Sequence, residues 1–150
     1  SFNIEVKKEY PSASARPLNV RVHRTGLIQI INNLFTNAAY AMSDKGILKV
    51  GLKQALLDRK MEIETGLKPG HYAIISVIDS GSGMDEKTLK SLFQPFYTTK
   101  PVGIGTGLGL SVIQGIVRSW DGTVTARSKL GEGSTFSVYI PLAKSEVGSV

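Results

Sequence analysis

The 150-residue sequence contains no cysteine, so it forms no disulfide bond and offers no thiolate as a metal ligand or nucleophile. No apolar run approaches the roughly 18 residues that a membrane-spanning helix needs. The net charge is +6, but the lysines and arginines are scattered and form no basic run of the kind that marks nucleic-acid binding. We therefore expect neither a nucleic-acid partner nor direct membrane contact from this domain.

Composition and periodicity predict one globular domain of mixed α and β structure. Hydrophobic residues make up 41% of the chain and charged residues 20%, which is ordinary for a globular domain. Hydrophobic spacing predicts helices at 25–46, 84–93 and 108–120, with Gly46 ending the first. Alternation predicts strands at 2–10, 18–23, 47–55, 71–79, 122–128 and 134–142, with a hairpin-type connection at 56–70. This order predicts a two-layer α/β sandwich with helices on one face of a mixed sheet.

The segment DSGSGM, residues 79–84, follows a mostly apolar strand. A carboxylate at Asp79 can accept a hydrogen bond from an exocyclic amine such as that of adenine. Gly81 and Gly83 have no Cβ, so a planar ring can lie against their backbone. Asp-Ser-Gly is also common turn chemistry, and that interpretation stays open.

The segment NNLFTNAAYAM, residues 32–42, lies within the longest predicted helix. Asn33 and Asn37 are four residues apart and share one helical face, which is otherwise apolar. A neutral amide oxygen can complete a Mg²⁺ shell when phosphates and waters supply the other ligands. The alternative is that both asparagines lie at the solvent edge of an amphipathic helix.

The segment GIGTGLGL, residues 103–110, places four glycines immediately before a helix. Glycine-rich backbone lets N–H groups converge on an anion, and the helix N-terminus adds the positive end of its dipole. The segment lacks the P-loop pattern and does not follow a strand as a dinucleotide-binding loop does. A surface linker is the alternative interpretation.

Two further motifs flank this glycine-rich segment. In LFQPFYTTK, residues 92–100, Phe93 and Phe96 are expected to pack inward, while Lys100 could reach a phosphate or remain solvated. In GEGSTF, residues 131–136, two glycines predict a tight turn and Thr135 opens a strand.

These motifs occur in a fixed order along the chain: N-x-x-x-N-A, D-x-G-x-G, F-x-P-F, G-x-G-L-G-L and G-x-G-[ST]-x-F. From about residue 18 to 142 this order resembles the catalytic, ATP-binding domain of sensor histidine kinases. The kinases share the Bergerat-fold, or GHKL, superfamily with Hsp90, MutL and gyrase-type proteins. TNAAYAM, PFYTTK and GTGLGLSVIQGIV look most like the nitrogen-regulator and hybrid-kinase branch. The resemblance implies a mostly antiparallel sheet of about five strands with three main helices on one face.

The resemblance also implies roles for individual residues in binding ATP and Mg²⁺. Asn37 would be the Mg²⁺ ligand, Asp79 would read the adenine amine, and Thr135 would border the adenine pocket beside Asp79. Gly105, Gly107 and Gly109 would belong to a lid over the phosphates. The full nucleotide-binding set is Asn37, Asp79, Gly81, Gly83, Met84, Lys100, Gly105, Thr106, Gly107, Leu108, Gly109, Leu110 and Thr135.

The sequence departs from related proteins at three positions. Where Hsp90, MutL and gyrase-type proteins carry a water-activating Glu, this chain has Asn33, which cannot act as a base. The resemblance therefore favours phosphoryl transfer over hydrolysis, with Asn33, Asn37 and Lys100 as catalytic residues. Many sensor kinases have a Lys and a Tyr where this chain has Tyr40 and Ala41.

The resemblance implies that the phosphate acceptor lies outside this chain. Sensor kinases carry the acceptor histidine on a helical dimerisation domain, and the phosphoryl group passes on to a response-regulator receiver domain. We expect His23 and His71 to be structural, because neither lies in a long helical dimerisation pattern. We expect an N-terminal strand and loop at 1–17 that lead into the domain, the catalytic ATP-binding domain at 18–142 and a C-terminal tail at 143–150, in a cytoplasmic setting. A Bergerat-fold ATPase, a Ser/Thr kinase of the superfamily and a non-enzymatic adaptor remain alternatives.

We predict that Lys100 supplies the phosphate cation that the missing lysine at position 40 provides in many sensor kinases. The substitution Lys100→Ala should then weaken ATP binding, measured by titration, and slow phosphoryl transfer, because a positive charge beside the phosphates is lost. Unchanged affinity together with an unchanged transfer rate would contradict this role.

Overall fold

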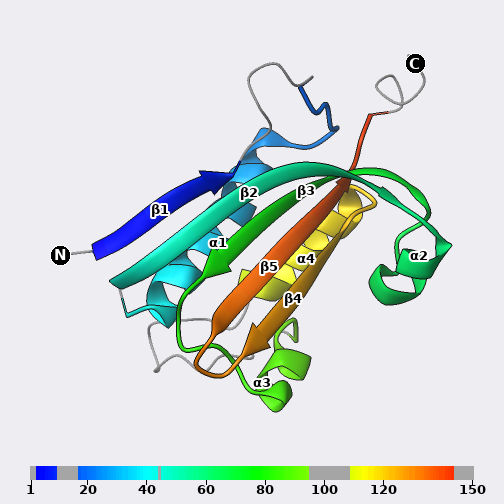
Figure 1. Cartoon of the computed structure of the whole chain (residues 1–150). Helices are drawn as coiled ribbons and strands as arrows, with labels where there is room; N and C mark the ends of the chain where they lie inside the picture. The colour runs from blue at the N-terminus through cyan, green and yellow to red at the C-terminus, as the bar shows by residue number, and fades with distance from the viewer. Residues whose placement is uncertain (1–2, 10–16, 44, 95–108, 144–150) are drawn as a thin grey trace.

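The computed structural model describes residues 3–9, 17–43, 45–94 and 109–143. Five strands in this part of the chain form one sheet in the order β1-β2-β3-β5-β4 (Figure 1). β1 is parallel to β2, and all other neighbouring strands are antiparallel. The mixed, mostly antiparallel sheet expected from the sequence is therefore confirmed. The strands are β1 (Asn3–Glu9), β2 (Lys45–Leu57), β3 (Gly70–Asp79), β4 (Thr123–Lys129) and β5 (Gly133–Pro141).

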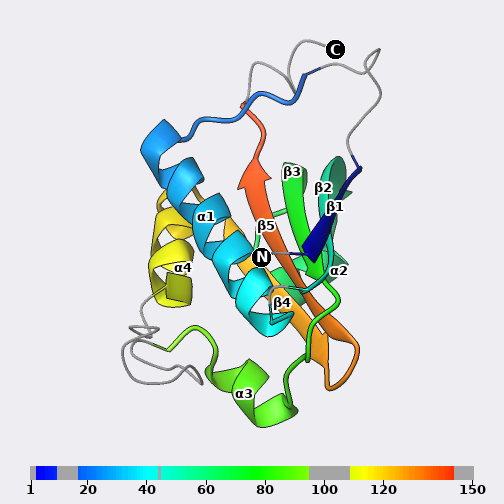
Figure 2. The ribbon, with the colours of Figure 1, turned by 90° about the vertical axis from the view of Figure 1, so that its left-hand side faces the viewer.

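Helices α1 (Arg24–Ala41) and α4 (Gly109–Ser119) lie side by side across one face of the sheet (Figure 2). Helix α3 (Glu86–Ser91) lies at one end of the sheet and contributes Leu89 to the same hydrophobic core. The buried residues of α1 recur at helical spacing, as do those of α4, so each helix turns one apolar stripe toward the sheet. These residues are Ile30, Leu34 and Ala38 in α1 and Ile113 and Val117 in α4.

The two long helices approach each other closely near Gly26. A Cβ added at Gly26 would lie 3.0 Å from the Trp120 ring and 3.1 Å from the Ile116 side chain. The missing side chain at Gly26 therefore lets the Trp120 ring lie against the first turns of α1.

Helix α2 (Arg59–Thr65) replaces the hairpin-type connection that was predicted at 56–70. The Asp58 carboxylate caps this helix by accepting a hydrogen bond of 3.0 Å from the Met61 N–H. Gly66 ends it in the left-handed conformation, at φ 73°. Met61 packs against the buried side chains of Leu57 and Tyr72, away from the main core. The prediction missed an N-cap and a C-terminal glycine that were both readable in the sequence.

Two other predictions also change, and one is confirmed. The expected strand at 18–23 contributes only an isolated bridge between Val20 and Leu142. The first helix ends at Ala41, and Gly46 lies within β2 rather than at the helix end. The strand predicted at 2–10 is confirmed as β1, which joins the sheet beside β2.

Glycine at position 122 is required by the contact between the end of α4 and strand β5. A Cβ at Gly122 would lie 2.0 Å from the Tyr139 carbonyl oxygen and 2.9 Å from Val117 Cγ1. We predict that Gly122→Ala lowers the free energy of unfolding, measured with urea, by about 2–3 kcal/mol, because β5 or α4 must shift.

Gly115 provides the matched control, since nothing lies within 4 Å of a Cβ added there, in the middle of α4. Gly115→Ala should raise the free energy of unfolding by about 0.5–1 kcal/mol, because alanine loses less backbone entropy in a helix. Equal effects of the two substitutions would show that the contact at Gly122 is unimportant.

Candidate nucleotide-binding site

Asp79 is a buried carboxylate at the end of the central strand β3, and its exposed fraction is only 4%. Its Oδ1 accepts a hydrogen bond of 2.9 Å from the Gly81 N–H, and the backbone N–H of Ser134 also donates to the carboxylate. Burial raises the pKa of Asp79 above its usual value, and these two hydrogen bonds offset part of that rise. A carboxylate has about four lone-pair sites, so two N–H donors leave acceptor capacity for a ligand amine.

The loop after Asp79 is held between α1 and the β4–β5 turn. The Ser82 N–H donates to the Ala41 carbonyl over 3.1 Å, and the Gly131 N–H donates to the Ser82 carbonyl over 2.8 Å. A Cβ at Gly81 would lie 2.6 Å from the Ala41 oxygen. Gly83 has φ 71°, and a Cβ there would lie 2.0 Å from the Lys129 oxygen. Close approach of neighbouring backbone therefore requires both glycines, independently of any bound ring.

The register of β3 and β5 places Ser134, and not Thr135, beside Asp79. Asp79 pairs with Ser134, and Ile78 pairs with Thr135. Because successive strand residues point to opposite faces, Thr135 lies on the face away from Asp79. Ser134 is buried, like Asp79. The prediction that Thr135 lies beside Asp79 was therefore wrong by one residue. Strand alternation places Ser134 on the same face as the apolar Phe136, and this pattern could have identified Ser134 as the neighbour of Asp79 from the sequence.

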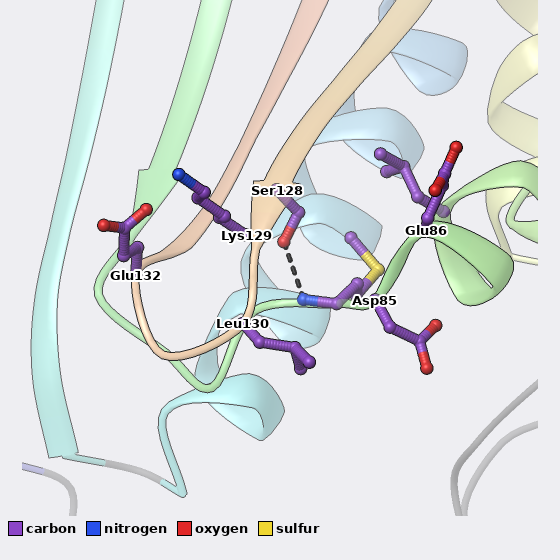
Figure 3. Close-up of a pocket in the computed structure, with 8 residues that line it drawn as sticks. Asp85, Glu86, Ser128, Lys129, Leu130 and Glu132 are labelled. Atoms are coloured by element: carbon purple, nitrogen blue, oxygen red, sulfur yellow. Dashed lines mark hydrogen bonds between the residues drawn. The ribbon is translucent and has the colours of Figure 1, made fainter.

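Ser128 of β4 links these segments through its side-chain hydroxyl. Its Oγ lies 2.7 Å from the Met84 nitrogen, 2.9 Å from the Gly133 oxygen and 2.8 Å from Ser134 Oγ (Figure 3 shows the bond to Met84). No sequence motif pointed to Ser128. The network fixes Met84, a predicted nucleotide contact, to the strand that follows α4.

An open hollow of about 540 Å³ lies between α3 and the β4–β5 turn, and Met84 and Ser128 both line it (Figure 3). The charged residues that line it are Asp85, Glu86, Lys129 and Glu132. Asp79 and the α1 asparagines do not line this hollow, so it is separate from the buried carboxylate. Asp85 caps α3 by accepting from the Thr88 N–H over 2.7 Å, and this bond lowers the pKa of Asp85.

Asn33, one of the two α1 asparagines, lies next to the start of α4. Asn33 and Asn37 are both half-buried on α1. A Cβ added at Gly109, the first residue of α4, would lie 3.8 Å from Asn33 Oδ1. Helix α4 therefore begins beside Asn33, so the positive end of its dipole lies close to an amide side chain.

The structure describes only two of the residues predicted for the lid. Gly109 and Leu110 belong to α4, and Leu110 packs against the main core. The other residues expected in or near the lid lie outside the described part of the chain: Phe96, Lys100, Gly105, Thr106, Gly107 and Leu108. The proposed tail at 143–150 lies outside it as well, except for Ala143.

Among the described residues, no group of three or more His, Asp or Glu side chains is arranged to hold a metal ion. A divalent cation at the α1 asparagines would therefore rely on amide oxygens together with oxygens of a bound ligand. This donor set suits Mg²⁺, which keeps waters and phosphates in its shell. None of the described helices is both long and apolar enough to cross a membrane.

The fold and the site define a class of protein: a two-layer domain in which a buried carboxylate ends the central strand and Asn33 of one helix lies beside the start of another. The sequence profile of the histidine kinase-, DNA gyrase B- and HSP90-like ATPases matches residues 22–144. The chain belongs to this family, which confirms the resemblance at the family level. The branch within the family stays a prediction.

Curated relatives of the chain are sensor kinases. It is 34% identical over 114 residues to sensor kinase CckA of Brucella abortus, covering 75% of this chain and 12% of that protein. It is 36% identical over 116 residues to sensor histidine kinase ZraS of Escherichia coli K12, covering 77% and 22%. With sporulation kinase C of Bacillus subtilis it shares 31% identity over 140 residues, covering 93% and 28%. The chain thus spans little more than a quarter of these relatives at most.

Solved structures support the same fold. The nucleotide-free catalytic domain of histidine kinase ThkA superposes with a TM-score of 0.69 at 28% identity, covering 93% of this chain and 80% of that one. Full-length ShkA in complex with AMPPNP gives a TM-score of 0.69 at 23% identity, covering 93% and 26%. The two-layer architecture expected from the sequence is therefore that of histidine kinase catalytic domains.

The buried position of Asp79 predicts a pH dependence of stability. Because burial raises its pKa above the reference value of 3.8, its stabilising contribution is present below that value and is lost as the pH rises through the raised pKa. We expect the free energy of unfolding of the unmodified protein to fall relative to that of Asp79→Asn as the pH rises from about 3.5 to about 7. Urea denaturation across this range measures the difference, and a pH-independent difference would contradict the burial effect.

Proposed function

We propose that this chain is the ATP-binding catalytic domain of a sensor histidine kinase, which transfers the γ-phosphoryl group of ATP to a histidine on a separate dimerisation domain. One observation carries the proposal: the buried Asp79 carboxylate receives two backbone N–H groups and keeps lone pairs for an adenine amine. An amine that donates to a buried carboxylate makes a charge-assisted hydrogen bond, stronger than one in water.

The phosphates are proposed to lie between the α1 asparagines and the start of α4. Gly109 begins α4 beside Asn33, so the positive end of the helix dipole lies next to the Asn33 amide. We assign Asn37 as the residue that would hold Mg²⁺ through its amide oxygen. Mg²⁺ bound there would neutralise charge that develops on the phosphates. Lys100, Gly105, Thr106, Gly107 and Leu108 complete the proposed site as lid residues.

Phosphoryl transfer is favoured over hydrolysis because Asn33 has no titratable group. An amide cannot accept a proton from water, so the residue cannot serve as the general base that a Glu at this position would provide. In the proposed reaction, an imidazole nitrogen bonds to the γ-phosphorus while the bond to the bridging oxygen breaks and ADP leaves. The chain contributes by positioning the reactants and by stabilising charge.

The acceptor is proposed to come from outside the described residues. His23 directly precedes α1, and His71 lies within β3, where its carbonyl accepts a hydrogen bond of 3.0 Å from the Leu142 N–H. Both histidines therefore belong to the folded domain itself, and neither lies on a separate helical hairpin. We propose that the partners are the histidine-bearing dimerisation domain of the same protein and a response-regulator receiver domain. Because the substrate is ATP, the domain is proposed to act in the cytoplasm.

Titration calorimetry with ATP and Mg²⁺ tests the nucleotide site. We predict that Asp79→Asn weakens ATP binding by about 30- to 100-fold. The charge-assisted hydrogen bond to the adenine amine is lost, and the NH₂ group of Asn replaces one oxygen that accepted hydrogen bonds. Asp58→Asn is the matched control: Asp58 caps the remote helix α2, and Asn is an equally good cap, so ATP affinity should not change. Absence of ATP binding by the unmodified chain would overturn the proposal in favour of a non-enzymatic adaptor.

The type of transfer is tested with the full-length protein and radiolabelled ATP. The proposal expects acid-labile phosphoprotein and slow ATP hydrolysis in the absence of an acceptor. Acid-stable phosphoprotein would indicate a Ser/Thr kinase instead. Rapid hydrolysis without an acceptor would indicate an ATPase that performs conformational work.

A further inference from the structure

The hydroxyl of Ser128 has three hydrogen-bond partners, and their chemistry determines where each proton lies. The Met84 nitrogen can only donate, and the Gly133 carbonyl oxygen can only accept. The third partner, Ser134 Oγ at 2.8 Å, can do either. A serine hydroxyl has one proton and two acceptor lone pairs, so these three bonds use its full capacity.

The direction of the bond between the two serines follows from this count. The single proton of Ser128 is used on the Gly133 carbonyl, and one of its lone pairs accepts the Met84 N–H. The remaining lone pair must accept from Ser134, so the Ser134 hydroxyl proton points to Ser128 and not to Asp79. Ser134 lies opposite Asp79 in the register, on the same face of the sheet. The Ser134 oxygen therefore presents only lone pairs to a ligand beside Asp79. Together, the Ser134 hydroxyl and the Asp79 carboxylate offer hydrogen-bond acceptors and no donor.

We propose that Ser128 is a positioning residue for base selection: by holding the Ser134 proton, it makes Asp79 and Ser134 a pair of adjacent acceptors that selects a 6-amino purine over a 6-oxo purine. This inference rests on the proposed nucleotide site and assigns a role to a residue that does not itself contact the base. Adenine presents an amino group with two hydrogens to such a pair. Hypoxanthine presents a carbonyl oxygen, which an acceptor-only corner repels.

The test compares the binding of ATP and inosine triphosphate by titration calorimetry. In Ser128→Ala the Ser134 proton loses its acceptor and becomes free to donate toward a ligand carbonyl. We expect the ratio of ATP affinity to inosine triphosphate affinity to fall about tenfold, the effect of one hydrogen bond. Ser128→Thr keeps the hydroxyl on a strand where β-branched residues are favoured, and it should restore the ratio.

Two further variants separate positioning from general loosening of the site. Ser137→Ala changes a serine on the opposite face of β5 and should leave the ratio unchanged. Ser134→Ala removes the hydroxyl through which Ser128 acts, so adding Ser128→Ala to it should change the ratio no further. Additive effects of the two substitutions would overturn the proposal, as would an unchanged ratio in Ser128→Ala.

The outcomes also distinguish this inference from the proposed function. If the unmodified chain binds neither nucleotide, both fail. If it binds ATP and Ser128→Ala weakens both nucleotides equally, the nucleotide site stands and the positioning role of Ser128 is overturned.

Discussion

The candidate site depends on the hydrogen bonds that allow Asp79 to keep a carboxylate inside the protein. The Gly81 N–H comes from the loop that follows β3, and the Ser134 N–H comes from β5, so the carboxylate joins two segments far apart in the sequence. Burial alone opposes the charge, and these donors offset part of that cost. The β3–β5 register therefore determines the chemistry around Asp79. A slip by one residue would place Thr135 instead of Ser134 opposite Asp79 and would turn every β5 side chain to the other face of the sheet.

Both layers of the sandwich hold the loop that follows Asp79. Ala41, at the end of α1, receives the Ser82 N–H, while the β4–β5 turn donates to the Ser82 carbonyl. Ile47 of β2 adds a third support, because its N–H donates to Ser80 Oγ over 2.9 Å and its carbonyl accepts the Ser80 N–H. A loop held from three sides presents Asp79 in one position, which is the preorganisation that selective binding requires.

Much of this arrangement could be predicted from the sequence. Helical periodicity identified α1, an apolar run identified the central strand β3, and the order of motifs identified the family. Contacts between distant segments could not be read in this way. Gly83 resembles a ring-contacting glycine in sequence, yet the Lys129 backbone is what excludes a side chain there. Ser128 carries no motif at all, because its importance arises from three partners that only the folded chain brings together.

The glycine contacts at the two ends of the helix pair also constrain how α4 can move. Its C-terminal end has close contacts on two sides. The Tyr139 carbonyl lies against Gly122, and the Trp120 ring lies against Gly26. At its N-terminal end, a Cβ added at Gly109 would lie 3.8 Å from Asn33 Oδ1, which is an ordinary van der Waals distance. A side chain added at Gly26 or Gly122 would therefore displace the C-terminal end of α4 relative to both α1 and β5.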